Sequence, residues 1–147
     1  MNKKILISTG GSGGHVIPAT VLYDHLKNDA TILMTTDLRG LKFFDNKKYK
    51  IKIINTPKLT SKFFLSFING FHILFLMLKC IFLLKKKGIN ILISTGGYMS
   101  LPLCFAAYIL NIKIYLFEPN MVLGRANSFF LKLSNKIFCY SKEIKKY

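Results

Sequence analysis

The heptapeptide Ile-Leu-Ile-Ser-Thr-Gly-Gly occurs twice in this 147-residue chain, at residues 5–11 and again at residues 91–97. In each copy a short β-branched run ends in paired glycines, a pattern typical of a buried strand followed by a sharp turn. Such a turn leaves backbone N–H groups free at the start of the next helix, where they can bind an anion. If both copies belong to one parallel sheet, their turns lie at the same edge, which suits a diphosphate.

The rest of the chain alternates between strand and helix patterns. We predict strands over residues 4–8, 30–35, 51–55, 90–94, 113–117 and 136–139, and helices over residues 16–27, 63–84, 99–110 and 125–133. This alternation predicts an α/β fold with a mostly parallel sheet, in which ligands bind beyond the carboxyl ends of the strands. The length is that of a single domain.

The composition is basic and apolar. The chain has 22 Lys and Arg against 6 Asp and Glu, and its mean hydropathy is +0.35. This charge would attract nucleic acid, anionic lipid or a phosphorylated substrate, although an AT-rich genome would also account for the many lysines. The apolar content calls for a surface that a membrane or a partner covers. Cys80, Cys104 and Cys139 are odd in number and widely spaced, so we predict buried thiols and neither disulfides nor a zinc site.

The first glycine turn carries the richest set of candidate binding residues. These are Gly10, Gly11, Ser12, Gly13, Gly14 and His15. A neutral imidazole at this position could accept a proton from a sugar hydroxyl, and the alternative is a histidine that caps the helix or orients a ligand. A nicotinamide site is a competing interpretation, because Asp37 follows the second predicted strand as a ribose-binding carboxylate would. The glycine register disfavours it, since Val16 then stands where the third glycine belongs.

Two further segments place candidate residues at the same edge. The second turn contains Gly96, Gly97 and Tyr98, and Tyr98 could stack on a ligand or form a hydrogen bond with it. Glu118 follows an apolar strand in the next loop. A loop carboxylate is most often a solvated charge, but this one is a second candidate for a base or a ligand of a hydroxyl.

Residues 10–19, 96–98 and 118–127 together resemble the amino-terminal domain of the MurG family, glycosyltransferase family 28. The resemblance covers essentially the whole chain. It implies a Rossmann-like, doubly wound parallel sheet that forms the amino-terminal half of a GT-B glycosyltransferase. Residues 1–147 would then be the acceptor-binding domain, and the carboxyl-terminal donor domain would be absent from this chain.

The resemblance also implies an activity. Family members transfer N-acetylglucosamine from UDP-N-acetylglucosamine to undecaprenyl-diphosphate-linked N-acetylmuramoyl-pentapeptide in peptidoglycan synthesis, with inversion and with neither metal nor cofactor. The absence of an Asp-x-Asp pair from the chain fits this expectation. The expected partners are these two substrates and an anionic membrane surface, with no nucleic acid, and the expected location is peripheral, on the cytoplasmic face of the bacterial inner membrane.

The resemblance assigns roles to individual residues. His15 matches a histidine proposed to help activate the acceptor hydroxyl. Four residues match positions that border the donor: Ser12, Gly13, Gly14 and Asn120. Asn127 lies in the third matching segment and is a further candidate for substrate binding. Glu118 remains the second catalytic candidate.

Two departures from the family pattern limit what the resemblance implies. Phe117 and Pro119 replace a histidine and a glutamine of the usual loop, and the chain stops at Tyr147, before a donor domain. We therefore keep open a non-catalytic, membrane-associated module that binds lipid diphosphate, or one subunit of a split glycosyltransferase that a separate donor-domain subunit completes. A nicotinamide-dependent oxidoreductase fragment is a third, weaker alternative.

Residues 63–84 form a long apolar segment. As a helix it would extend about 33 Å, enough to cross a bilayer by length. Polar groups within it, including His72 and Lys79, disfavour a crossing helix. We predict a helix with one face buried against the sheet, exposed Phe and Leu side chains in the membrane surface and lysines at the headgroups. The alternative is an ordinary core helix.

Overall fold

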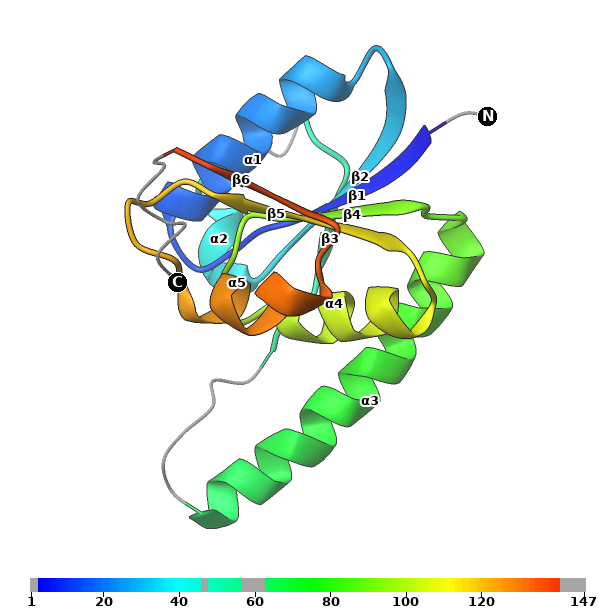
Figure 1. The fold of residues 1–147 in the computed structure, drawn as a ribbon. Helices are drawn as coiled ribbons and strands as arrows, with labels where there is room; N and C mark the ends of the chain where they lie inside the picture. Colours follow the sequence, from blue (N-terminus) through cyan, green and yellow to red (C-terminus); the bar gives the residue numbers. More distant parts are fainter. Residues whose placement is uncertain (1–2, 46–47, 57–62, 141–147) are drawn as a thin grey trace.

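Six parallel strands form one sheet in the order β3-β2-β1-β4-β5-β6 (Figure 1). The computed structural model describes residues 3–45, 48–56 and 63–140. The strands are β1 (Lys3–Ser8), β2 (Ala30–Thr36), β3 (Ile51–Ile53), β4 (Ile91–Ser94), β5 (Lys113–Glu118) and β6 (Lys136–Cys139). The predicted α/β class is confirmed, and the sheet is parallel throughout.

The two copies of the repeated heptapeptide lie side by side in this sheet. β1 pairs with β4, and the register joins Ile5 to Ile91 and Ser8 to Ser94. The pairing continues past the strands, where Thr95 N donates to Ser8 O at 3.0 Å. The four strand residues of one copy are therefore level with their counterparts, and both glycine turns leave the same edge as predicted.

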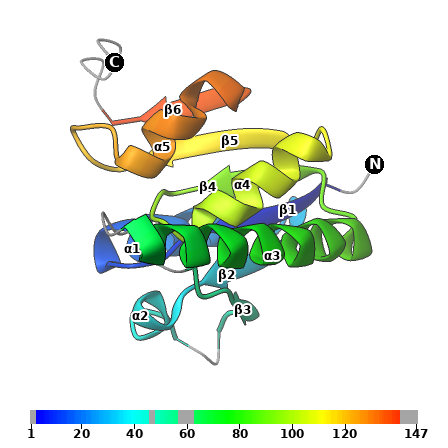
Figure 2. The ribbon, with the colours of Figure 1, turned by 90° about the horizontal axis from the view of Figure 1, so that it is seen from below.

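Helices cover both faces of the sheet, as Figures 1 and 2 show. α1 (Gly13–Leu26) lies on one face, and α3 (Phe63–Lys87), α4 (Ser100–Ile109) and α5 (Arg125–Phe130) lie on the other. The β1 side chains alternate between two cores, since Ile5 and Ile7 pack on the α1 side and Leu6 packs on the α3 and α4 side. This arrangement is the doubly wound, Rossmann-like fold that the resemblance implied.

Several element boundaries differ from the prediction. α1 begins at Gly13 because Ser12 has the extended backbone of a residue that precedes a helix. A short helix, α2 (Leu38–Leu41), stands where we expected a polar connection, and the Asp37 side chain caps it by accepting from Gly40 N. A 3₁₀ turn, η1 (Leu131–Leu133), completes what we predicted as the end of an α-helix. Of the three predicted buried thiols, Cys139 is exposed because it lies on the edge strand β6.

α3 is the longest helix among the described residues and continues three residues beyond its predicted end. Gly88 stops it with a φ of +63°, and Ile89 N donates back to Leu84 O at 3.0 Å. Its carboxyl-terminal half packs on the sheet through buried Cys80, Leu83 and Leu84. In the part of the chain that the structure describes, no helix combines the length and apolar character that a bilayer crossing requires.

Candidate functional site

The two glycine turns touch each other beyond the ends of β1 and β4. A Cβ added to Gly97 would lie 3.1 Å from the backbone oxygen of Gly10. A Cβ added to Gly10 would lie 2.7 Å from Met99 Cγ. Gly11, Gly96 and Gly97 have φ values of +85°, +96° and +88°, which other residues rarely adopt. The glycines are therefore needed both for the backbone conformation of the turns and for the close contact between them.

His15 joins the first turn to the second. It is the third residue of α1, and its imidazole lies over Gly96, where an added Cβ would be 3.1 Å from Cε1 and 3.3 Å from Nδ1. Nδ1 is buried and has no hydrogen-bond partner among the described residues. A buried ring nitrogen without a hydrogen-bond partner is uncommon in proteins, which marks this contact as a candidate functional feature.

A pocket of about 400 Å³ opens at the meeting point of the two turns. It is lined by Gly10, Gly11, Ser12, His15, Arg39, Gly97, Tyr98, Gly124, Arg125 and Ala126. Six of these residues are among the predicted site residues. They come from both copies of the repeat, from the residue that directly follows each copy, and from α1. Gly96 lies against the His15 ring, and Gly13 and Gly14 open α1 without lining the pocket.

Arg39 and Arg125 are lining residues that the sequence reasoning did not select as site residues. They are the only arginines in a chain whose other cations are lysines. Because a guanidinium binds phosphate oxygens through two parallel hydrogen bonds, arginine is well suited to a phosphate site. The signal in the sequence was only that these are its two arginines; that they meet at one pocket is visible only in the tertiary structure.

Asp37 stabilises the first glycine turn through hydrogen bonds. Its Oδ1 accepts from Gly11 N and from Gly40 N, each at 2.8 Å, and its Oδ2 accepts from Arg39 Nε at 2.9 Å. Burial opposes the charged form, but these backbone donors and the guanidinium outweigh it and lower the pKa of Asp37. The carboxylate is engaged with its own protein, so it does not have the free oxygens that a nicotinamide ribose would need.

Glu118 organises the loop that follows β5. Its side chain is 1% exposed, and its two oxygens accept four hydrogen bonds from within the loop and α5. Oε1 accepts from Asn120 N and Nδ2 at 3.1 and 2.8 Å. Oε2 accepts from Gly124 N and Asn127 Nδ2 at 2.8 and 3.0 Å. These bonds place Gly124 at the pocket, whereas Glu118 itself is not a lining residue there.

Asn127 connects the Glu118 loop with the second turn. It is 1% exposed, and its Nδ2 also donates to Phe117 O at 3.3 Å. The same Nδ2 lies 3.5 Å from a Cβ added to Gly96, on the side where the His15 ring packs. Asn127 Oδ1 is buried without a hydrogen-bond partner among the described residues. Neither Asn127 nor Asn120 lines the pocket, so direct substrate contact by either stays a prediction.

The pocket has the chemistry of an anion site. Among its described lining residues none is acidic and two are arginines, and the first turn of α1 adds backbone N–H groups that no side chain caps at Ser12. No three His, Cys, Asp or Glu side chains gather as a metal site in the described ranges. Independence from metal and cofactor remains an expectation of the sequence.

Comparison with known proteins shows the family to which the chain belongs. A family model described as the glycosyltransferase family 28 N-terminal domain matches residues 5–139. A Pelagibacter ubique (strain HTCC1062) protein named UDP-N-acetylglucosamine--N-acetylmuramyl-(pentapeptide) pyrophosphoryl-undecaprenol N-acetylglucosamine transferase is 56% identical over 147 residues. That match covers 100% of this chain and 41% of the relative. The chain thus spans about two fifths of the length of this relative.

Solved structures share the fold. The crystal structure of Acinetobacter baumannii MurG superimposes with a TM-score of 0.80 at 19% identity, over 95% of this chain and 42% of that one. The S. aureus MnaA-UDP co-structure gives a TM-score of 0.72 at 13% identity, over 98% of this chain and 39% of that one. Since the family model matches most of the chain and the Pelagibacter relative aligns with all of it, the chain belongs to glycosyltransferase family 28, as a MurG-like N-terminal domain.

Proposed function

We propose that this chain supplies the acceptor-binding and membrane-facing half of a peptidoglycan N-acetylglucosaminyltransferase. The reaction would move N-acetylglucosamine from UDP-N-acetylglucosamine to an undecaprenyl-diphosphate-linked N-acetylmuramoyl-pentapeptide, as the name of the Pelagibacter relative states for that protein. The observation that carries the proposal is the pocket where the two glycine turns meet, because it combines an imidazole with two arginines and free backbone donors.

The acceptor diphosphate would occupy this pocket. Arg39, Arg125 and the N–H groups at the start of α1 would bind its oxygens, and Tyr98 would contact the adjoining sugar. The glycines allow the backbone to approach the phosphates without side chains in between. This arrangement would bring the muramyl 4-hydroxyl toward His15.

His15 would then act as the general base. Its imidazole takes the proton of the muramyl 4-hydroxyl as that oxygen attacks the anomeric carbon of N-acetylglucosamine, and UDP leaves with inversion at that carbon. Positive charge and backbone dipoles would stabilise the leaving diphosphate without a metal. Glu118 would serve as a positioning residue, since its oxygens already accept hydrogen bonds from Asn120, Gly124 and Asn127.

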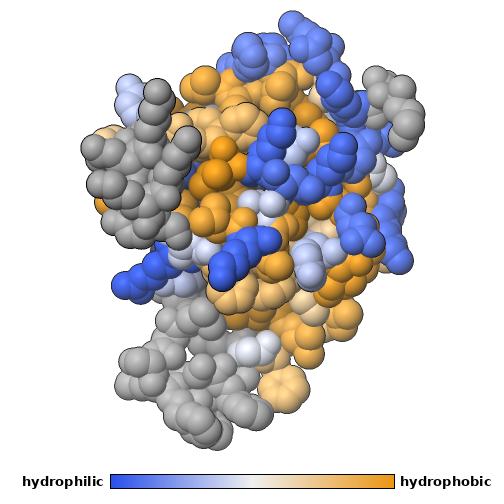
Figure 3. All heavy atoms as spheres, viewed as in Figure 1, coloured by the Kyte–Doolittle hydropathy of each residue, from blue (hydrophilic) through white to orange (hydrophobic). Residues whose placement is uncertain are grey.

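α3 would face the membrane. Its exposed apolar side chains form one ridge along the helix, comprising Phe71, Leu74, Phe75, Leu78 and Phe82. Figure 3 shows hydrophobic surface in the lower part of the molecule, where α3 runs in Figure 1. Lys85, Lys86 and Lys87 end the helix. An apolar ridge that ends in lysines suits peripheral attachment to an anionic membrane surface, with the acceptor lipid close by.

A chimera tests the proposed reaction. This chain, joined to the part of the Pelagibacter relative that lies beyond the matched region, should transfer N-acetylglucosamine to the lipid acceptor. His15→Ala should lower kcat by about 100-fold or more, the usual contribution of a general base, while acceptor binding persists. His25→Ala is the matched control, because it removes an exposed imidazole from the same helix at a position that does not line the pocket. Unchanged turnover in the His15 variant would refute the base assignment.

The alternative is a module that binds lipid diphosphate without catalysis, and the observation that favours it is the pair of arginines in the pocket, which can bind an anion without any proton transfer. In that case the isolated chain should bind a polyprenyl diphosphate through Arg39 and Arg125, and the chimera should show no transfer. Transfer by the chimera would exclude this alternative for the assembled site.

A further inference from the structure

Two buried polar atoms beside the second glycine turn have no hydrogen-bond partner. They are His15 Nδ1 and Asn127 Oδ1. In the part of the chain that the structure describes, every other buried side-chain nitrogen or oxygen without a partner is a threonine hydroxyl, which can rotate its proton toward a nearby acceptor. A ring nitrogen and an amide oxygen have no such freedom, so these two atoms need a separate explanation.

Both side chains lie over Gly96. A Cβ added to Gly96 would be 3.3 Å from His15 Nδ1 and 3.5 Å from Asn127 Nδ2. Gly96 also has a φ of +96°, a conformation that favours glycine. Because no side chain stands at this position, the edge of the imidazole can approach the amide group of Asn127.

Glu118 fixes which way the Asn127 amide points. Asn127 Nδ2 donates to Glu118 Oε2 at 3.0 Å and to Phe117 O at 3.3 Å. Both partners are acceptors, so a rotation that exchanged the amide nitrogen and oxygen would place an oxygen against them. Asn127 Oδ1 is therefore an acceptor that still needs a donor.

The imidazole of His15 can supply this donor. A neutral imidazole carries one N–H, on either Nδ1 or Nε2. Nδ1 is buried, whereas the His15 side chain also lines the pocket at the glycine turns, so Nε2 is the nitrogen left to meet a ligand there. A proton on Nδ1 would give Asn127 Oδ1 its donor and would leave a lone pair on Nε2.

We propose that Asn127 is a positioning residue for His15. Its Oδ1 accepts from His15 Nδ1–H, which selects the Nδ1–H tautomer and leaves Nε2 unprotonated toward the acceptor hydroxyl. A small turn of the imidazole closes this bond, since catalytic hydrogen bonds are often long before substrate binds. The Glu118 carboxylate, which accepts from Asn127 Nδ2, completes a chain of three side chains.

This inference rests on the proposed function, in which His15 is the general base. When Nε2 takes the hydroxyl proton, the imidazole becomes a cation, and its Nδ1–H bond to Asn127 strengthens. The proton stays on Nε2, because an amide oxygen is too weak a base to receive one. The Glu118 charge, one hydrogen bond further away, stabilises the cation without touching it.

The tautomer of His15 can be measured directly in the 147-residue chain. Long-range proton–nitrogen NMR of ¹⁵N-histidine-labelled chain distinguishes a protonated from an unprotonated ring nitrogen at about pH 8.5, where an ordinary imidazole is neutral. His25 and His72 are exposed and serve as references in the same spectrum. We expect the Nδ1–H form at His15 and mostly the Nε2–H form, which free histidine prefers, at the references. The Nε2–H form at His15 would overturn the proposal without any variant.

Two asparagine variants separate positioning of His15 from support of the loop. Asn127→Ala removes Oδ1, so the Nδ1–H population of His15 should fall by about half or more. Asn120→Ala is the matched control, because Asn120 Nδ2 also donates to Glu118, at 2.8 Å, but Asn120 is exposed. In that variant His15 should keep the Nδ1–H form. An unchanged tautomer in Asn127→Ala, or the same change in both variants, would refute the assigned role.

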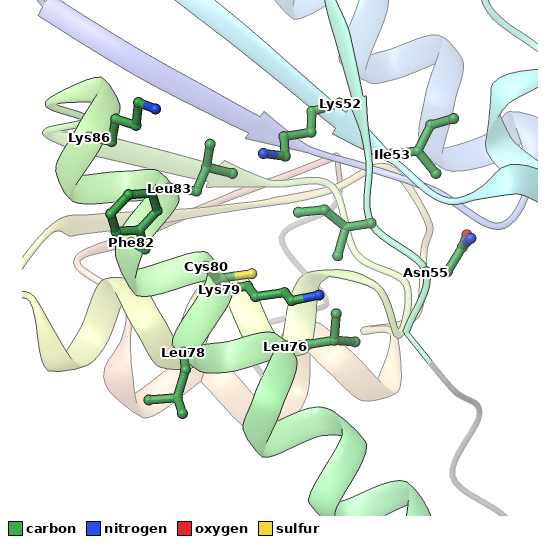
Figure 4. Close-up of a pocket in the computed structure, with 11 residues that line it drawn as sticks. Lys52, Ile53, Asn55, Leu76, Leu78, Lys79, Cys80, Phe82, Leu83 and Lys86 are labelled. Atoms are coloured by element: carbon green, nitrogen blue, oxygen red, sulfur yellow. The ribbon is translucent and has the colours of Figure 1, made fainter.

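A third variant controls for a general loss of stability. Leu83 is 6% exposed and lines a cavity of about 630 Å³ between β3 and α3 (Figure 4). None of the residues described around that cavity lines the pocket at the glycine turns. Leu83→Ala should therefore loosen the core and leave the His15 tautomer unchanged. A change as large as that in Asn127→Ala would show that the tautomer follows any loss of packing. Matching circular dichroism spectra would verify that the variants are folded.

Turnover of the chimera separates this inference from the proposed function. Asn127→Ala should lower kcat by about tenfold or more at nearly unchanged KM for the lipid acceptor, because the base is held in the wrong form while the substrate still binds. A raised KM with an unchanged His15 tautomer would make Asn127 a substrate-binding residue and would overturn the inference. An inactive chimera with the unaltered chain would count against the proposed function and leave the tautomer measurement unaffected.

Discussion

The two copies of the repeated heptapeptide have the same sequence and lie in register, yet their turns are supported differently. In the first, the Asp37 carboxylate accepts from Gly11 N at 2.8 Å. In the second, Gly96 N donates to Ser94 Oγ at 3.2 Å, and the His15 ring packs above Gly96. The first turn is held by a buried charge, and the second is held by a short local bond and by contact with its neighbour.

The corresponding glycines are also required for different reasons. Gly96 has a φ of +96°, whereas its counterpart Gly10 has no positive φ and is confined by Met99 and Asp37 instead. Gly11 and Gly97 share a positive φ, but only Gly97 lies against another backbone. The comparison teaches that one sequence pattern can be required by backbone conformation in one place and by lack of space in another.

The largest expected effect comes from the second glycine of the second copy. Gly97→Ala combines a φ of +88° with a Cβ 3.1 Å from the Gly10 oxygen, so we expect the free energy of unfolding to fall by about 3 kcal/mol. Urea unfolding followed by circular dichroism measures it. Gly11→Ala is the matched control, since its φ is +85° and the nearest atom is 3.8 Å away; it should cost about 1 kcal/mol. Equal losses of stability in the two variants would mean that the contact between Gly97 and the Gly10 oxygen adds no steric cost.

The next effect concerns the loop beside the second turn. Glu118→Gln replaces one buried acceptor oxygen by an NH₂ group that faces N–H donors, so we expect a loss of about 2.5 kcal/mol of stability. Thermal and urea unfolding measure it, and turnover of the chimera distinguishes two roles. A positioning residue should lose stability and turnover together. A variant of normal stability that had lost all turnover would instead favour Glu118 as the base.

Removal of the charge that supports the first turn should have a slightly smaller effect. Asp37→Asn should cost about 2 kcal/mol near pH 7, because the bonds from Gly11, Gly40 and Arg39 lose their ionic character.

The effect of Asp37 should also depend on pH in a defined direction. The folded-state pKa of Asp37 lies below the ordinary value of 3.8, so its stabilisation is fully present above that value and is lost as pH falls through the folded pKa. Urea unfolding between pH 7 and pH 2 should show a steeper acid loss in the wild type than in Asp37→Asn. Parallel curves would contradict the assigned role of the carboxylate.

The smallest expected effect is at the start of α1. A Cβ added to Gly14 meets only Ser12 Oγ at 3.7 Å, so Gly14→Ala should change stability by less than about 1 kcal/mol, with a gain favoured by helix propensity. Urea unfolding measures the change. The same variant tests the substrate-binding prediction for Gly14, because weaker acceptor binding at unchanged stability would support it. A large loss of stability would show that the start of α1 is more crowded than its geometry indicates.

Much of the fold could be predicted from local patterns. The β-branched runs and paired glycines predicted β1 and β4 with their turns, and alternation along the chain predicted a parallel α/β sheet. α2 was missed because a four-residue helix is about one turn long and shows no repeating pattern in the sequence. Its capping residue, Asp37, was interpreted as a possible ribose-binding carboxylate. Arg39 was missed because only the strand order brings α2, which follows β2, beside the turn after β1.

The sequence by itself determined the strand, turn and helix units, because φ preferences and side-chain alternation act between near neighbours. Only the tertiary structure decided what each copy of the repeat does. The contact of His15 with Gly96, the bond between Asp37 and Gly11 and the burial of Glu118 depend on strand order and on which polar groups lose water. His15 and Gly96, like Asp37 and Gly11, lie far apart in the chain, where no local preference acts. The Asp37 and Glu118 carboxylates are buried only where N–H donors meet them, because burying an unpaired charge is costly.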